Sequence, residues 1–107
     1  MKILFDQGTP VPLRAYLTEH DVDTAYERGW SGLQNGDLLQ ATENEAYDVF
    51  VTTDQNLKYQ QNMTGRRLAI LVLLTTSWPI IKPHSVEICR AIEGLLVGEY
   101  KEFEFDL

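Results

Sequence analysis

The chain is short of cysteine, of long apolar runs and of positive charge, and each shortage argues against a class of protein. Of its 107 residues only Cys89 is a cysteine, so no internal disulfide can form and nothing requires an oxidising compartment. The longest apolar run, LAILVLL at 68–74, is far shorter than the ~20 residues of a membrane span. The N-terminus also lacks the long apolar region of a signal peptide. We therefore expect a soluble, cytoplasmic protein with no membrane segment.

Positive charge is scarce. The chain has 9 lysines and arginines against 16 aspartates and glutamates, which gives a formal net charge of −7. Because the basic residues form no block, we do not expect strong nonspecific attraction to the phosphates of nucleic acids. An excess of acids is compatible with a site in which clustered carboxylates are neutralised by bound cations.

The rest of the composition is that of one folded domain. Apolar residues make up 44% of the chain and aromatic residues 10%, enough for a hydrophobic core. No segment is rich enough in Gly, Ser or Pro to indicate a linker, and no internal repeat occurs. A chain of this length is too short for two domains of ordinary size. We therefore expect a single domain over residues 1–107.

Short apolar runs alternate with helical patterns along the chain. The apolar runs predict strands, and apolar residues at helical spacing predict helices. Because strands and helices alternate, we expect the α/β class, with a mainly parallel sheet covered by helices on both faces. The predicted strands are 2–6, 21–26, 49–53, 68–74 and 100–105, and the predicted helical segments are 9–20, 37–46, 56–62 and 88–96, the last closed by Gly98.

Two of the predicted strands run directly into an aspartate. VFVTTDQN at 49–56 contains Asp54, and KILFD at 2–6 ends in Asp6. Parallel sheets bind ligands beyond the carboxyl ends of their strands, so we expect both carboxylates in one crevice, with Asp37 as the third acid. Such carboxylates repel one another and favour a hard cation, Mg²⁺ or Mn²⁺. Each aspartate could instead cap a turn or a helix, and both roles stay open.

Polar residues around the strand ends are candidate contacts for a substrate. Gln55 and Asn56 can orient metal-bound water or hydrogen-bond a phosphate without adding charge. Tyr59 can stack on a base, and Arg14 can pair with a phosphate. Each has a structural alternative: surface or capping for the amides, packing for Tyr59 and a solvated helix charge for Arg14.

Four segments of the chain share a further pattern: KILFD, GDLLQAT, VFVTTDQNLKYQQN and GRRLAILVL. Together they resemble PIN-like domains assigned as predicted nucleases of toxin–antitoxin systems. The resemblance covers most of the chain up to about residue 74, and DQNLKYQQN is its most specific part. It implies a PIN-like three-layer α/β/α sandwich around a mainly parallel sheet. It also implies Mg²⁺- or Mn²⁺-dependent cleavage of RNA by Asp6, Asp37 and Asp54, and an antitoxin protein as partner.

Other interpretations stay open beside this one. Gln7 and Asn56 stand where many relatives have a further carboxylate, which favours as an alternative a catalytically inactive PIN-like module that binds a protein or RNA partner. A phosphorylated nucleophile at Asp6 is disfavoured, because Gly8 stands where phosphatases of that type have a second aspartate. A homodimer formed through the C-terminal helix and the Trp78 segment is a further expectation.

Overall fold

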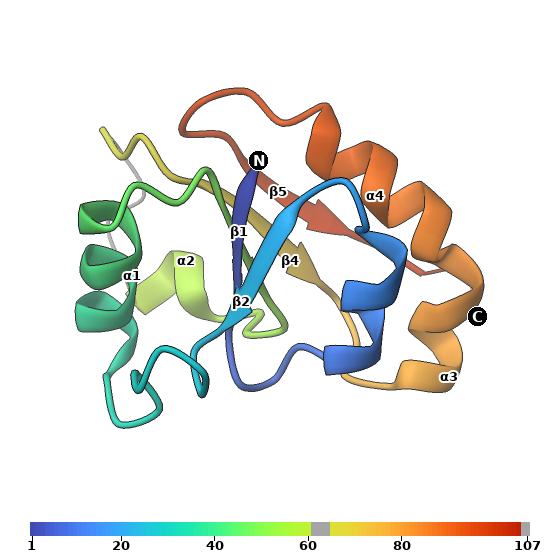
Figure 1. The fold of residues 1–107 in the computed structure, drawn as a ribbon, viewed down its shortest axis with the longest axis horizontal. Coiled ribbons are helices and arrows are strands. Elements are labelled where there is room, and N and C mark those ends of the chain that lie inside the picture. Colours follow the sequence, from blue (N-terminus) through green and yellow to red (C-terminus); the bar gives the residue numbers. More distant parts are fainter. Residues whose placement is uncertain (61–64, 106–107) are drawn as a thin grey trace.

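The computed structural model describes residues 1–60 and 65–105, without the side chains of Asn35, Tyr59 and Gln60. Its strands are β1 (Lys2–Phe5), β2 (Asp21–Thr24), β3 (Val49–Thr52), β4 (Ala69–Leu73) and β5 (Tyr100–Phe103). They form one sheet in the order β2-β1-β3-β4-β5, and every neighbouring pair is parallel (Figure 1). The predicted α/β class with a parallel sheet is therefore confirmed.

The inner strands are buried and the outer strands are partly exposed. All residues of β3 and β4 are buried, as expected for apolar strands of a parallel sheet with both faces covered. The β5 strand, YKEF, lies at one edge and keeps Lys101 exposed. A charged residue on an edge strand discourages pairing with another chain. The prediction that 100–105 contains a half-exposed edge strand is confirmed.

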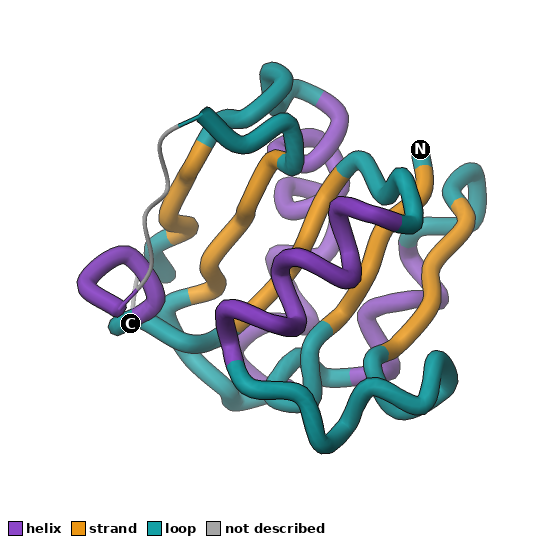
Figure 2. Tube along the Cα trace, turned by 90° about the vertical axis from the view of Figure 1, so that its left-hand side faces the viewer, coloured by secondary structure: helices purple, strands orange, loops and turns teal. Residues whose placement is uncertain are grey.

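Helices cover both faces of the sheet (Figure 2). One hydrophobic cluster joins Leu38 and Leu39 to one face, and a second joins Leu13, Ile81 and Ile88 to the other. No helix formed by the described residues is long and apolar enough to cross a membrane. The first face carries α1 (Asn35–Asn44) and α2 (Leu57–Gln60); the second carries η1 (Val11–Tyr16), α3 (Trp78–Ile81) and α4 (Ser85–Glu93), with η2 (Lys82–His84) between the last two.

Alternate residues of β1 enter the two clusters. Ile3 and Phe5 belong to the cluster under α4, and Leu4 belongs to the cluster under α1, as the period of two in a strand requires. All three side chains are fully buried. Burying each stabilises the fold by roughly 1.5–3 kcal/mol. The end of β1, and with it Asp6, is therefore held firmly in the core.

The predicted helix within 9–20 forms only in part, as the 3-10 helix η1. Pro12 stands in its first turn, where the missing N–H breaks no helical hydrogen bond. The helix ends at Tyr16 because Leu17 takes φ −113° and ψ 44°, and its N–H donates to the carbonyl of Arg14 at 3.0 Å. The prolines allowed a helix start, but they could not indicate where the helix would end.

The prediction that the last helix continues to Gly98 is wrong. Helix α4 ends at Glu93, and the N–H of Gly94 donates to the carbonyl of Arg90 at 3.0 Å. Gly98 lies in the turn before β5 with φ +75°, and its N–H donates to the carbonyl of Arg67 at 2.9 Å. A glycine with positive φ therefore ends the connection and not the helix.

We expect Gly98→Ala to destabilise the protein more than Gly29→Ala does. Both glycines have φ +75°, so an alanine costs roughly 1–2 kcal/mol at either position. A Cβ at Gly98 would also collide with the carbonyl oxygen of Arg66, which adds roughly 1–3 kcal/mol, whereas nothing lies within 4 Å of a Cβ at Gly29. Urea unfolding of both variants measures the difference; equal losses would contradict the close approach at Gly98.

Candidate functional site

The strand order reverses direction between β1 and β3, and Asp6 lies at this point. From β1 the chain adds β2 on one side and β3, β4 and β5 on the other. In doubly wound sheets the crevice at such a reversal is where ligands bind. Asp6 directly follows β1, and its N–H donates to the carbonyl of Val51 in β3 at 3.1 Å. Asp6 and Asp54 therefore follow neighbouring strands at the same edge, as the sequence predicts.

The Asp6 carboxylate is half-buried and accepts hydrogen bonds on both oxygens. Oδ1 accepts the N–H of Gly8 at 3.1 Å and lies 3.0 Å from the hydroxyl of Thr9, and Oδ2 accepts the hydroxyl of Thr52. Thr9 shares its proton with the carbonyl of Val51, 2.9 Å away. Burial raises the pKa of Asp6 above its ordinary value, and the hydrogen bonds only partly offset this effect. Keeping the carboxylate of Asp6 ionised therefore costs the folded protein some stability.

Thr52 connects the two aspartates. Its hydroxyl donates to Asp6 and accepts the backbone N–H of Asp54 at 3.0 Å. The Asp54 carboxylate accepts the N–H of Asn56 at 3.0 Å, and its carbonyl accepts the N–H of Leu57 at 3.3 Å. Asp54 thus stabilises the turn that leads into α2. The turn-forming role expected for this aspartate is therefore present, and its backbone N–H is linked to Asp6 through Thr52.

Asp37 is exposed in the first turn of α1. Its helix begins after Gln34, so Asp37 is not the N-terminal cap residue. Among residues 1–60 and 65–105, the group with three metal-ligand atoms within 4.8 Å of one another is His20, Cys89 and Glu93. Asp6, Asp37 and Asp54 do not form such a group. The carboxyl edge therefore offers a cation one or two carboxylates and not a closed three-carboxylate cage.

Asp6 opens into a cavity of about 500 Å³ that also contains Arg14. Nη1 of Arg14 lies 2.7 Å from the Glu27 carboxylate and donates to the carbonyl of Val22 at 3.3 Å. The hydrogen bond from Arg14 lowers the pKa of Glu27, which is exposed. The structure thus brings together Asp6 and Arg14 from the residues predicted for the site. The cavity is lined by Asp6, Gln7, Thr9, Val11, Arg14, Thr24, Tyr26 and Glu27.

A larger cavity, of about 580 Å³, lies at the opposite edge of the sheet beside Met1, Asp48 and Leu96. If volume alone decided, this larger cavity would be the candidate functional site. The smaller cavity contains the buried carboxylate with the raised pKa and a guanidinium, and perturbed titratable groups in a cleft mark functional sites better than volume does. We therefore place the candidate site at the carboxyl edge.

The other predicted contacts differ in how well they are placed. Gln55 and Asn56 are exposed in the turn after Asp54. Tyr59 belongs to α2, but its side chain lies outside the described part of the chain. Tyr26, which the sequence did not single out, lines the cavity and is 79% exposed. It follows β2 at the carboxyl edge, so the rule that selected Asp6 could have found it.

We expect Asp6→Asn to stabilise the protein at pH 7. An asparagine keeps an acceptor for Gly8 and can donate to Thr52, but it never carries the buried charge. The raised pKa means that ionisation of Asp6 costs stability above the folded-state pKa, and that this cost disappears as the pH falls toward the ordinary value of 3.8. The advantage of the variant should therefore shrink on acidification and be absent below pH 3.8, as urea unfolding across this range would show.

Asp6→Ala is the matched control for this prediction. It also removes the charge, but it leaves the buried hydroxyl of Thr52 without its acceptor, which costs roughly 1–3 kcal/mol. Asp6→Ala should therefore be less stable than Asp6→Asn at every pH. A lower stability of Asp6→Asn than of the unmodified chain at pH 7 would refute the burial cost.

No protein-family model, curated protein or solved structure matches this chain. Its resemblance to PIN-like domains therefore stays a prediction from the residues that carry it. What the chain does has to be inferred from the side chains at the carboxyl edge of β1 and β3.

Proposed function

We propose that this chain is a metal-dependent ribonuclease of the PIN-like type, which hydrolyses RNA phosphodiester bonds at the carboxyl edge of β1 and β3. The observation that supports this best is Asp6, a half-buried carboxylate at the reversal of strand order, facing a cavity that also holds Arg14. A carboxylate for a cation and a guanidinium for a phosphate are the two groups that phosphodiester cleavage needs most. The toxin of a toxin–antitoxin pair is the biological role that fits this activity.

The residues at this edge fit Mg²⁺ or Mn²⁺. Oδ2 of Asp6 accepts the hydroxyl of Thr52, and a carboxylate oxygen has a second lone pair that can bind a cation. The Asp54 carboxylate follows the neighbouring strand, and Asp37 would complete the set. Mg²⁺ is usually held by one or two carboxylates, with water and substrate phosphate in its other positions. The absence of a three-carboxylate cage therefore does not disagree with this cation.

The chain itself would bind and orient the RNA. Arg14 uses Nη1 for Glu27 and Val22, and a guanidinium has further N–H donors that can hold a phosphate oxygen. The exposed ring of Tyr26 offers a surface on which a base can stack. A divalent ion bound by the carboxylates would lower the pKa of a water molecule and stabilise the leaving oxygen. Gln55 and Asn56 would contribute hydrogen bonds without adding negative charge.

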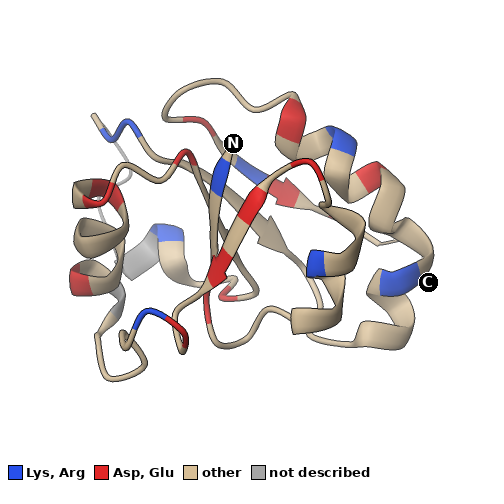
Figure 3. Ribbon diagram, viewed as in Figure 1, with Lys and Arg blue, Asp and Glu red and all other residues tan. Residues whose placement is uncertain are grey.

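The distribution of acidic residues supports a local site. Figure 3 shows Asp and Glu on helices, strands and loops over the whole view, not in a single patch. The net charge of −7 is therefore spread over the molecule. A phosphate would be repelled weakly from all sides and attracted at Arg14, so the substrate has to be recognised by contacts inside the cavity.

The alternative is a PIN-like module without catalytic activity that binds RNA or a protein. One observation favours it: Asp6, Asp37 and Asp54 do not bring three ligand atoms within 4.8 Å of one another. The amides of Gln7 and Asn56 add no charge to attract a cation. Such a module would bind its partner equally well with and without Mg²⁺ or Mn²⁺.

Asp54→Asn and, separately, Asp6→Asn should abolish Mn²⁺-dependent cleavage of single-stranded RNA. Each removes a negative ligand, and loss of the cation should lower kcat/KM by at least about 100-fold. Asp21→Asn, at the amino end of β2, is the control and should cleave at the rate of the unmodified chain. Undiminished cleavage by Asp54→Asn and Asp6→Asn would exclude this site. No cleavage by any of the proteins, with RNA bound independently of metal, would favour the alternative.

Arg14→Gln should weaken substrate binding more than it slows the chemical step. A hydrogen bond to a charged group contributes roughly 1.5–3 kcal/mol, so KM should rise about 10- to 100-fold. Arg14→Lys should restore part of the affinity because it keeps the charge. Arg67→Gln, an exposed arginine before β4, is the matched control. Steady-state cleavage with and without each change gives both constants, and an unaltered KM in Arg14→Gln would remove Arg14 from the substrate site.

A further inference from the structure

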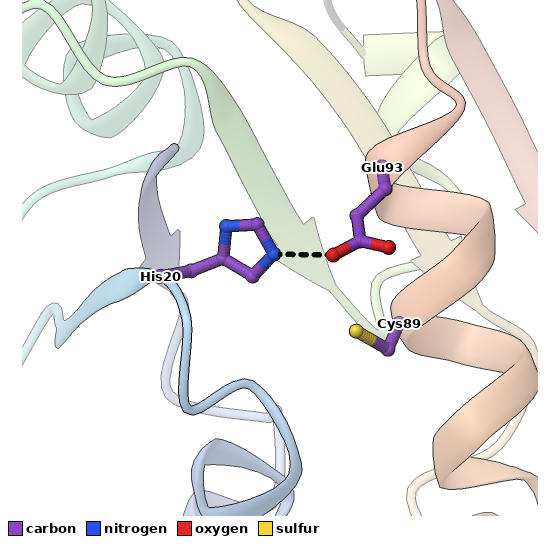
Figure 4. Close-up of side chains that lie close together, drawn as sticks. All are labelled: His20, Cys89 and Glu93. Carbon is purple, nitrogen blue, oxygen red and sulfur yellow. Dashed lines mark hydrogen bonds and ion pairs between the residues drawn. The ribbon is translucent and has the colours of Figure 1, made fainter.

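A second set of potential ligands meets at the other end of the sheet. His20 lies in the turn directly before β2, and Cys89 and Glu93 stand one turn apart on α4 (Figure 4). Nε2 of His20 lies 2.8 Å from Oε2 of Glu93. One ligand atom from each of the three side chains lies within 4.8 Å of the other two. An imidazole nitrogen, a thiol and a carboxylate therefore face one point between β2 and α4.

We propose that His20, Cys89 and Glu93 bind one Zn²⁺ ion. The site lies where β2 begins, whereas Asp6 follows the end of β1, so the two sites occupy opposite edges of the parallel sheet. The zinc site is independent of RNA cleavage and goes beyond the proposed function. Bound there, Zn²⁺ would connect the turn between η1 and β2 to the end of α4.

The mixture of donor atoms selects zinc. Zn²⁺ binds imidazole nitrogen, thiolate sulfur and carboxylate oxygen, with bonds of about 2.0–2.3 Å. Mg²⁺ and Ca²⁺ bind oxygen and do not take a thiolate. In a tetrahedron with those bond lengths the ligand atoms lie about 3.3–3.8 Å apart. The three ligand atoms already lie within 4.8 Å of one another, close to this spacing.

The surroundings allow an ion to enter and hold part of the site in place. The side chain of His20 is only 9% exposed, whereas that of Glu93 is 44% exposed. A cavity of about 310 Å³, also lined by Tyr16 and Val86, lies beside the three ligands. It leaves room for water or another small ligand as the fourth partner of the metal. A buried imidazole and an accessible side are what a three-ligand zinc site needs.

Zn²⁺ would replace the protons through which His20 and Cys89 now hydrogen-bond to Glu93. Burial, followed by the charge of Glu93, raises the pKa of the Cys89 thiol, which donates to that carboxylate. On binding, the S–H bond breaks, a Zn–S bond forms and the proton goes to solvent. Coordination through Nε2 of His20 moves the ring proton to Nδ1, so the Met1 ammonium group, 3.3 Å away, would have to release a proton to solvent and accept from Nδ1, or turn away. The other charged groups near the thiol are Glu19 and Arg90.

The competing explanation is that His20 and Glu93 form only an ion pair. Such a pair also joins the turn before β2 to α4, and it gives Cys89 no role. The two explanations differ in whether the thiol sulfur binds a metal. A test must therefore observe the sulfur directly and not stability alone.

Co²⁺ is a suitable probe because it takes the place of Zn²⁺ and absorbs light. We expect the reduced full-length chain to bind one Co²⁺, with the charge-transfer band of a thiolate ligand, and one equivalent of Zn²⁺ to remove the band. Cys89→Ser should lose the band. Loss of a hydrogen bond that supports a metal ligand weakens metal binding about 10- to 100-fold. His20→Gln and Glu93→Gln change a ligand itself, so they should weaken Co²⁺ binding at least as much. Glu87→Gln, also on α4 but outside the cluster, is the matched control and should bind normally.

The outcomes separate this site from the carboxyl edge. Asp6→Asn should keep the cobalt band, and a large excess of Mg²⁺ should not displace the metal. Absence of the band in the folded unmodified chain, or equal Zn²⁺ affinity in Cys89→Ser, would overturn the proposal. Circular dichroism checks that each variant is folded. Glu93→Gln is less disruptive to the fold than His20→Gln because the side chain of Glu93 is the more exposed of the two.

Discussion

Parallel pairing of β1 with β3 is the constraint on which the candidate site depends. Phe5 pairs with Val51, so Asp6 lies beside Thr52 in the next position of each chain. A slip by one residue would turn the side chains of β1 to the opposite face and move Ile3 and Phe5 out of their cluster. The hydrophobic core therefore fixes the register, and the register brings the Thr52 hydroxyl to the carboxylate of Asp6.

The same arrangement places the carboxylate of Asp6 in a half-buried position, where ionisation costs stability. The raised pKa of Asp6 shows that its three hydrogen-bond donors do not repay the loss of water. An asparagine would keep an acceptor for Gly8 and Thr9 and could donate to Thr52 without carrying a charge, so stability alone does not explain an aspartate here. A cation at Oδ2 would offset the cost, because an adjacent positive charge favours the ionised form. The energetic penalty is thus an argument for a functional role of Asp6. Asp54 provides no such argument, because its hydrogen bonds already explain it as a turn-forming residue.

The sequence predicted what depends on local patterns and missed what depends on distant contacts. Apolar runs located β1, β3 and β4, alternation located β5, and a weaker strand pattern located β2. The strand-end rule located Asp6 and Asp54. The length of the last helix was wrong because Gly94, and not Gly98, follows its final turn. His20 and Glu93 lie 73 residues apart in the sequence. Only the packing of α4 against the turn before β2 brings them together, and no local pattern records that contact.

The two edges of the sheet separate two kinds of cation chemistry. Only oxygen ligands follow the carboxyl ends of β1 and β3, whereas a nitrogen, a sulfur and an oxygen ligand meet between the amino end of β2 and α4. Because Mg²⁺ avoids thiolates and Zn²⁺ prefers a site with nitrogen and sulfur, each edge would select its own ion by ligand type if both proposals hold. The rigid sheet between them keeps the sets apart, so a zinc ion that stabilises α4 would leave the carboxylates available for a hard cation. One parallel sheet can in this way support a structural metal and a reactive one without competition between them.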